Sequence, residues 1–211
     1  MRSNAHFGTR IFGFIIPRLH LCLICAALKF ANLAAQLLRD RQAEPGYWLT
    51  TFTNQLSYEA PQQEMNTFLT SMIVDMLAPV AHQQSLDDVV NNARQHLAAQ
   101  IESNGLVRFH GLPNAPTIGK LGCVITPDSD DTALVWRIAD LSAADPRRQL
   151  MLAELARYRD SRGLYRTWLA PQTQYQCIDP GKDPNPTDIG IQMHVYPVSY
   201  THLTLPTNRE V

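Results

Sequence analysis

Three carboxylates fall within four residues of one segment, Asp128-Ser129-Asp130-Asp131. Carboxylates this close repel one another when charged, and the repulsion raises the pKa of at least one of them. Removal from water raises the pKa further, so that a buried member of the group can hold its proton near neutral pH. The residue types therefore predict a carboxylic acid that can donate a proton, with Asp130 between the other two acids.

The same four residues also suit a purely structural role at the beginning of a helix. Asp128 or Ser129 could cap the first exposed amides, and the acids that follow would place negative charge in the first turn. Acids also stand near the beginnings of two other predicted helices, at Glu64 and Asp188. This recurrence favours architecture over a single catalytic centre, although one segment can serve both roles.

A carbocation formed by protonation needs an apolar pocket lined by aromatic rings, because water would intercept it. Aromatic residues of suitable type stand on the same segment as the acids and beyond Gly163. We predict three substrate-binding residues of this kind: Trp136, Tyr165 and Trp168.

Six helices are expected to position these residues. The predicted beginnings carry Pro, Asp or Ser, which suit a first turn, and apolar residues then recur three and four positions apart. We predict inner helices at 61–78, 129–141 and 187–197, outer helices at 19–42, 86–103 and 146–160, and no substantial sheet.

The predicted helices form a repeat. Three times a helix ends in polar residues and is followed by a glycine and then by aromatic and apolar residues, at Gly46, Gly105 and Gly163. These glycines are 59 and 58 residues apart, and a period of this length indicates a repeated supersecondary unit. Glycine provides the left-handed backbone that ends a helix. The sequence therefore predicts an all-helical fold of about three helix hairpins.

Two of these segments resemble motifs of a known superfamily. Residues 42–48 are similar to the Gln-Trp repeats of squalene and hopene cyclases, and residues 127–136 resemble the Asp-x-Asp-Asp-Thr-Ala segment of class II terpene cyclases. The resemblance covers about residues 33–197 and implies the α/α toroid of the terpene cyclase and prenyltransferase superfamily, a ring of helix hairpins of which about half would be present. It also implies that Asp130, flanked by Asp128 and Asp131, protonates an isoprenoid alkene or epoxide, with no metal or cofactor.

Two other functions fit a toroid. One is a non-catalytic binding or scaffold module. The other is a zinc-dependent prenyltransferase, whose metal ligands are Asp, Cys and His. Cys177, Asp179 and His194 have these types, although the histidine follows sooner than in that family.

Composition limits the partners and the compartment. The net charge is −1, with 18 basic and 19 acidic residues, so that no nucleic-acid partner is expected. The four cysteines show no spacing typical of a disulfide framework. The apolar stretch at 19–28 is shorter than a membrane span. We expect a cytoplasmic protein with a small apolar ligand, and peripheral membrane association as the alternative.

The two ends of the chain differ from its middle. Residues 1–18 carry three arginines ahead of the apolar stretch, which loosely resembles a signal peptide, and we predict an N-terminal extension there. Residues 198–211 resemble translated sequencing adapter. The predicted domain therefore spans residues 19–197, followed by a tail that does not belong to it.

Overall fold

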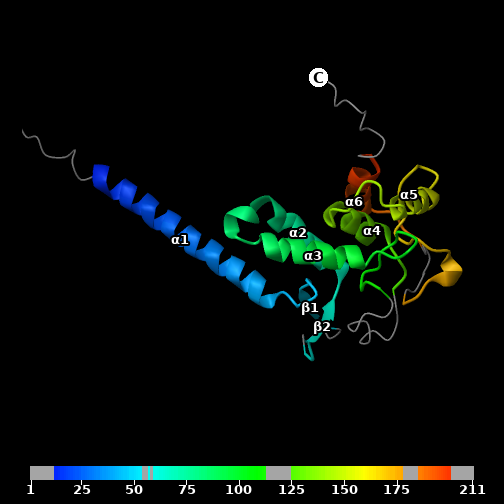
Figure 1. Cartoon of the computed structure of the whole chain (residues 1–211), viewed down its shortest axis with the longest axis horizontal. Coiled ribbons are helices and arrows are strands. Elements are labelled where there is room, and N and C mark those ends of the chain that lie inside the picture. The colour runs from blue at the N-terminus through cyan, green and yellow to red at the C-terminus, as the bar shows by residue number, and fades with distance from the viewer. Residues whose placement is uncertain (1–11, 54–56, 58, 113–124, 178–184, 201–211) are drawn as a thin grey trace, which may run out of the picture.

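The computed structural model describes residues 12–53, 57, 59–112, 125–177 and 185–200 (Figure 1). It is mainly helical, with 54% of residues in helices. The helices are α1 (Phe12–Arg41), α2 (Thr67–Leu77), α3 (Asp87–Ala99), α4 (Ser129–Ile138), α5 (Arg147–Arg157) and α6 (Ile189–Tyr200). Short 3-10 turns occupy Ala78–Val80, His82–Gln84 and Gln172–Gln174. Each of the six predicted helices has a counterpart, with shifted ends.

A small antiparallel sheet corrects the all-helical prediction. Strand β1 (Leu49–Phe52) pairs with β2 (Gln62–Met65), with Leu49 opposite Met65. The predicted helix at 61–78 therefore begins only at Thr67, because the preceding residues are paired as a strand and Asn66 caps the helix from an extended conformation. Glu64 lies in β2 and not in a first helical turn, so its interpretation as a helix-start acid is wrong.

The predicted repeat is confirmed by one turn that occurs three times. In each turn the residue three positions before the glycine donates its amide to the carbonyl of the residue after the glycine. The donors are Ala43, Glu102 and Asp160, at 2.8, 3.0 and 2.8 Å. Each glycine amide returns a bond to that same donor residue. The glycine φ angles, +101°, +86° and +82°, are left-handed, which explains the residue type.

Each of these turns lies between the two helices of one unit, and the described chain contains three such units. Unit 1 consists of α1, the Gly46 turn and α2; unit 2 of α3, the Gly105 turn and α4; unit 3 of α5, the Gly163 turn and α6. We call the first helix of each unit its outer helix and the second its inner helix. The inner helices pack in a row, α2 on α4 and α4 on α6, and the outer helix α3 packs on both α2 and α4. The amides of Thr67 and Ser129, which begin α2 and α4, donate to the carbonyls of Phe109 and Thr167 in the next unit, each at 2.8 Å. Main-chain bonds thus join α2 to unit 2 and α4 to unit 3.

Helix α1 departs from its prediction as a buried helix. It begins at Phe12, inside the predicted extension 1–18, and extends away from the other helices, with only its C-terminal end near them (Figure 1). Several large apolar side chains in its second half are more than half exposed: Leu28, Phe30, Leu33 and Leu37. No described unit precedes unit 1 to cover them.

Helix α6 continues into the predicted C-terminal tail. It runs past Pro197 to Tyr200, and Val198 and Ser199 are buried. Helix α6 thus extends three residues beyond the residue at which the predicted tail begins. Residues 201–211, like residues 1–11, lie outside the described part. Within the described residues, no helix combines the length and the apolar character that a membrane span requires.

Two of the turn glycines provide a matched pair for testing the interface between units. A Cβ on Gly105 would lie 2.4 Å from the carbonyl oxygen of Arg147 in α5, whereas a Cβ on Gly163 would meet no atom of the described residues within 4 Å. Gly163→Ala should lower the free energy of unfolding by about 1 kcal/mol, from the left-handed backbone alone. Gly105→Ala should lower it by about 2 kcal/mol more, because the units must move apart. Urea titration measures both, and equal losses would contradict the close packing of unit 2 on unit 3.

Candidate functional site

The first turn of α4 is held between extended segments from two units. Asp128 forms an antiparallel bridge with Trp168 of unit 3, and its amide donates to the Val107 carbonyl of unit 2 at 3.4 Å. The Ser129 hydroxyl donates to the Arg166 carbonyl at 2.6 Å. These bonds fix the helix start, so that the side chains it carries have defined directions.

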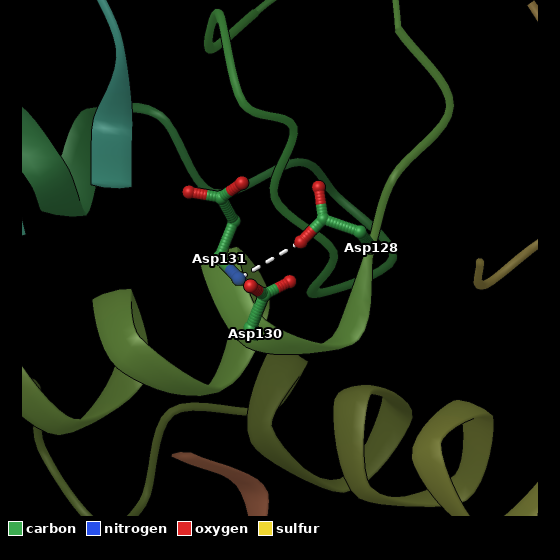
Figure 2. Close-up of side chains that lie close together, drawn as sticks. All are labelled: Asp128, Asp130 and Asp131. Atoms are coloured by element: carbon green, nitrogen blue, oxygen red, sulfur yellow. Dashed lines mark hydrogen bonds between the residues drawn. The ribbon is translucent and has the colours of Figure 1, made fainter. Parts of the chain in front are cut away.

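The three carboxyl groups lie side by side at this helix start (Figure 2). Asp128 is the N-cap and accepts the amide of Asp131 at 2.8 Å. Asp131 accepts the hydroxyl of Thr67, in α2, at 2.7 Å. Both are buried, 4% and 3% exposed, whereas Asp130 is only half-buried. One oxygen from each carboxyl can be chosen so that all three lie within 4.8 Å of one another.

Only part of this cluster is shared architecture. Each inner helix has an Asn or Asp N-cap that accepts the amide three residues on: Asn66 at 2.7 Å, Asp128 at 2.8 Å and Asp188 at 3.0 Å. The residues two and three positions after the cap are acidic only in unit 2. Their counterparts in the other units are Phe68, Leu69, Gly190 and Ile191. The cap is therefore structural in every unit, while acidic residues at the two positions of Asp130 and Asp131 occur in unit 2 alone among the three described units.

The electrostatics favour retention of protons in the cluster. Burial, followed by the charge of Asp130, raises the pKa of Asp131 to about 7, against the lowering effect of its hydrogen bonds with Asp128 and Thr67. Burial is also the largest cause that raises the pKa of Asp128 well above its ordinary value, followed by the charges of Asp131 and Asp130. Near neutral pH the cluster therefore holds at least one proton that an isolated aspartate would release.

A pocket of about 310 Å³ opens onto these acids. Aromatic and aliphatic side chains make up much of its wall, and the lining residues are Phe109, Ile125, Asp128, Asp130, Asp131, Thr167 and Trp168. Asn185 fixes Trp168 by accepting its amide at 2.8 Å and donating to its carbonyl at 2.9 Å. The arrangement places two carboxyl groups of raised pKa, Asp128 and Asp131, beside an apolar, ring-lined space, which suits proton transfer to an apolar molecule.

The structure brings one of the three predicted aromatic residues to this pocket. Trp168 lines it. Trp136 instead donates its indole N–H to the Gly105 carbonyl at 2.7 Å within the core. Tyr165 is buried with its hydroxyl bonded to Arg159. Neither is among the lining residues.

Sequence reasoning missed Phe109, Thr167 and the hydrogen bond from Thr67 to Asp131. Phe109 and Thr167 both stand four residues after their turn glycine. The main-chain carbonyls at this position bind the start of the preceding inner helix. Aligning the three turns by their glycines would have pointed to that position as one that meets the helix starts.

The zinc hypothesis loses a ligand. Cys177 is disulfide-bonded, so its sulfur is not available to a metal. The cysteine spacing, which is not typical of a disulfide framework, did not indicate this bond. Asp179 lies outside the described residues, and the His194 ring packs on Phe68 with centroids 5.8 Å apart. Among described residues, the three clustered aspartates are the group that could hold a metal ion. A divalent cation and a proton would compete for the same carboxylates.

The buried acid predicts a pH dependence of stability. A pKa of Asp131 raised above the unfolded value means that stability is full below the unfolded pKa and falls as pH rises towards 7. Between pH 5 and pH 7, the wild type should lose about 1 to 2 kcal/mol more free energy of unfolding than Asp131→Asn, which keeps an acceptor for Thr67. Asp140→Asn, at an exposed aspartate after α4, is the control and should follow the wild type. Parallel pH profiles for Asp131→Asn and wild type would refute the assignment.

Comparisons with known proteins do not assign the chain to a family. No protein-family model matches it, and no curated protein or solved structure is significantly similar to it.

Proposed function

We propose that the pocket protonates a carbon–carbon double bond of an isoprenoid, and that the three units form part of a terpene-cyclase-like α/α toroid. The observation that carries the proposal is the position of Asp130, half-buried at a ring-lined pocket and beside two buried acids. The toroid part of the proposal is supported by the packing of α2 on α4 and of α4 on α6, with the N-terminal ends of α2 and α4 bonded to the following unit.

The chemistry assigns Asp130 as the acid. Its proton is transferred to one alkene carbon, the π electrons form the new C–H bond, and a cation develops on the neighbouring carbon. The cation can then be attacked by a second double bond of the same chain, and it ends by losing a proton or adding water. Asp130 is left as a carboxylate and regains a proton from solvent.

The neighbouring acids set up this transfer. Asp128 lies beside Asp130, and its own pKa is raised well above the ordinary value, first by burial and then by the charges of the two neighbouring acids. Asp131 is fixed by Thr67 from the adjacent unit, so that its position does not depend on α4 alone. The rings of Trp168 and Phe109, which line the pocket, are of the type that stabilises a nearby cation.

A non-catalytic module is the second candidate, and one observation favours it. The N-cap role of Asp128 recurs at Asn66 and Asp188, so that part of the acidic motif is explained without catalysis. A module would bind an apolar ligand in the same pocket and return it unchanged.

The disulfide at Cys177 favours an oxidising compartment, so we propose that the protein works there and not in the cytoplasm.

The experiment is to incubate the full chain with squalene and, separately, with farnesyl diphosphate, each with and without EDTA. Protonation by Asp130 predicts cyclised or isomerised product from squalene that persists in EDTA. Product only from the diphosphate, and only without chelator, would instead show that the aspartates hold a metal. Unchanged squalene at pH 6 would overturn the proposal and favour the module.

A further inference from the structure

The inner helices of units 1 and 2 each bury the face that lies towards the following unit. On α6 the corresponding face is exposed. We define the trailing face by the positions one and five residues after the N-cap. In units 1 and 2 these residues are at most 1% exposed: Thr67, Ser71, Ser129 and Ala133. In unit 3 the same positions hold Ile189 and Met193, which are 76% and 68% exposed. Two large apolar side chains thus meet solvent where the repeat elsewhere makes a closed contact.

The opposite end of the row shows the reverse pattern. The position ten residues after the N-cap lies on the opposite side of the helix from the trailing face, and we call it the leading face. Ile138 and Val198 at this position are 7% and 4% exposed in units 2 and 3. In unit 1 the position holds Met76, which is 74% exposed. Unit 1 therefore presents an apolar side chain where its successors are buried.

The glycine turns carry the same asymmetry. A Cβ on Gly46 would lie 2.3 Å from the Asn92 carbonyl oxygen in α3, and a Cβ on Gly105 would lie 2.4 Å from that of Arg147 in α5. Each turn thus packs on the outer helix of the next unit. Around Gly163, no described residue comes within 4 Å of a Cβ. The turn and the inner helix of unit 3 are thus both bare on the side where a next unit would lie.

We propose that a second copy of this chain docks there head to tail, with the leading face of its unit 1 on the trailing face of unit 3. The contact would continue the α2–α4 and α4–α6 interfaces already present within the chain, with the same helix positions on each side. The two faces differ, so the contact is heterologous: it closes into a ring when the rotation permits and otherwise extends as a filament. This inference does not depend on the proposed function.

The test measures the mass of the full chain by sedimentation velocity over a concentration series. The mass should rise above the 23.7 kDa of one chain. Ile189→Glu with Met193→Glu should weaken association by about 10-fold or more, and so should Met76→Glu alone. Leu150→Glu is the control, because this residue on α5 is 50% exposed and its counterparts Leu33 and Asn92 are also exposed. It should leave association unchanged.

Mixing the variants separates head-to-tail docking from other contacts. The Met76→Glu chain keeps an intact trailing face, and the Ile189→Glu, Met193→Glu chain keeps an intact leading face. An equimolar mixture should therefore form a mixed dimer that grows no further. A wild type that stays monomeric over a 100-fold range of concentration, up to its solubility limit, would overturn the proposal. Association that ignores the Met76→Glu change would overturn it too, since it would indicate a contact between two α6 faces.

Discussion

Asp130→Asn should lower turnover of an isoprenoid alkene by about 100-fold to 10,000-fold, the contribution expected of a general acid. Asparagine preserves the size of the side chain at the pocket but cannot release a proton to carbon. The free energy of unfolding should change little, because Asp130 is half-buried and is not the cap of α4.

The matched control for this variant is Asp140→Asn, at the other end of the same helix. Asp140 is exposed, with a left-handed φ of 52° that asparagine tolerates well. Asp140→Asn makes the same substitution just beyond the other end of the same helix and should leave turnover at the wild-type value. Equal turnover in Asp130→Asn and Asp140→Asn would contradict the role of Asp130, since the two variants differ only in the position of the substitution.

Two substitutions of Asp128 should separate its structural role from its chemical role. Asn66 already performs the cap of α2, so Asp128→Asn should keep the cap and the free energy of unfolding nearly intact. It removes the buried carboxyl that lies beside Asp130, and turnover should fall by about 100-fold. Asp128→Ala loses the cap as well, and should also lower the free energy of unfolding by about 1 to 2 kcal/mol.

The measurements are urea unfolding and product formation on the wild type, Asp128→Asn and Asp128→Ala. Asp188→Asn provides the control, because Asp188 caps α6 but is not among the pocket-lining residues. It should change neither quantity appreciably. Turnover that survives in Asp128→Asn would leave this residue with its capping role alone.

The repeat could be predicted from sequence because its signal is local. A glycine after a polar helix end demands a left-handed backbone, and three such glycines at nearly equal spacing indicate three equivalent turns. The first residue of a helix was harder to predict where a distant segment of the chain pairs with the residues before it. Residues 62–65 read as the first turn of a helix, but pairing with β1 holds them as a strand.

The site could be predicted only in part, for the same physical reason. The acidic segment was visible as a motif, and its crowding predicted the direction of the pKa shifts. The wall of the pocket was not visible, because side-chain directions depend on contacts between units. Trp136 is turned into the core by the Gly105 carbonyl, 31 residues away, and Asp131 is fixed by Thr67, 64 residues away.

The most direct test of the central claim is the isotope content of the product formed from an unlabelled isoprenoid in D₂O. Asp130 exchanges its proton with solvent, so transfer to the alkene should place a single deuterium on carbon in each product molecule, as mass spectrometry would show, and Asp130→Asn should form almost none of it. A product without carbon-bound deuterium, or an equal yield of deuterated product from the variant, would contradict proton donation by Asp130.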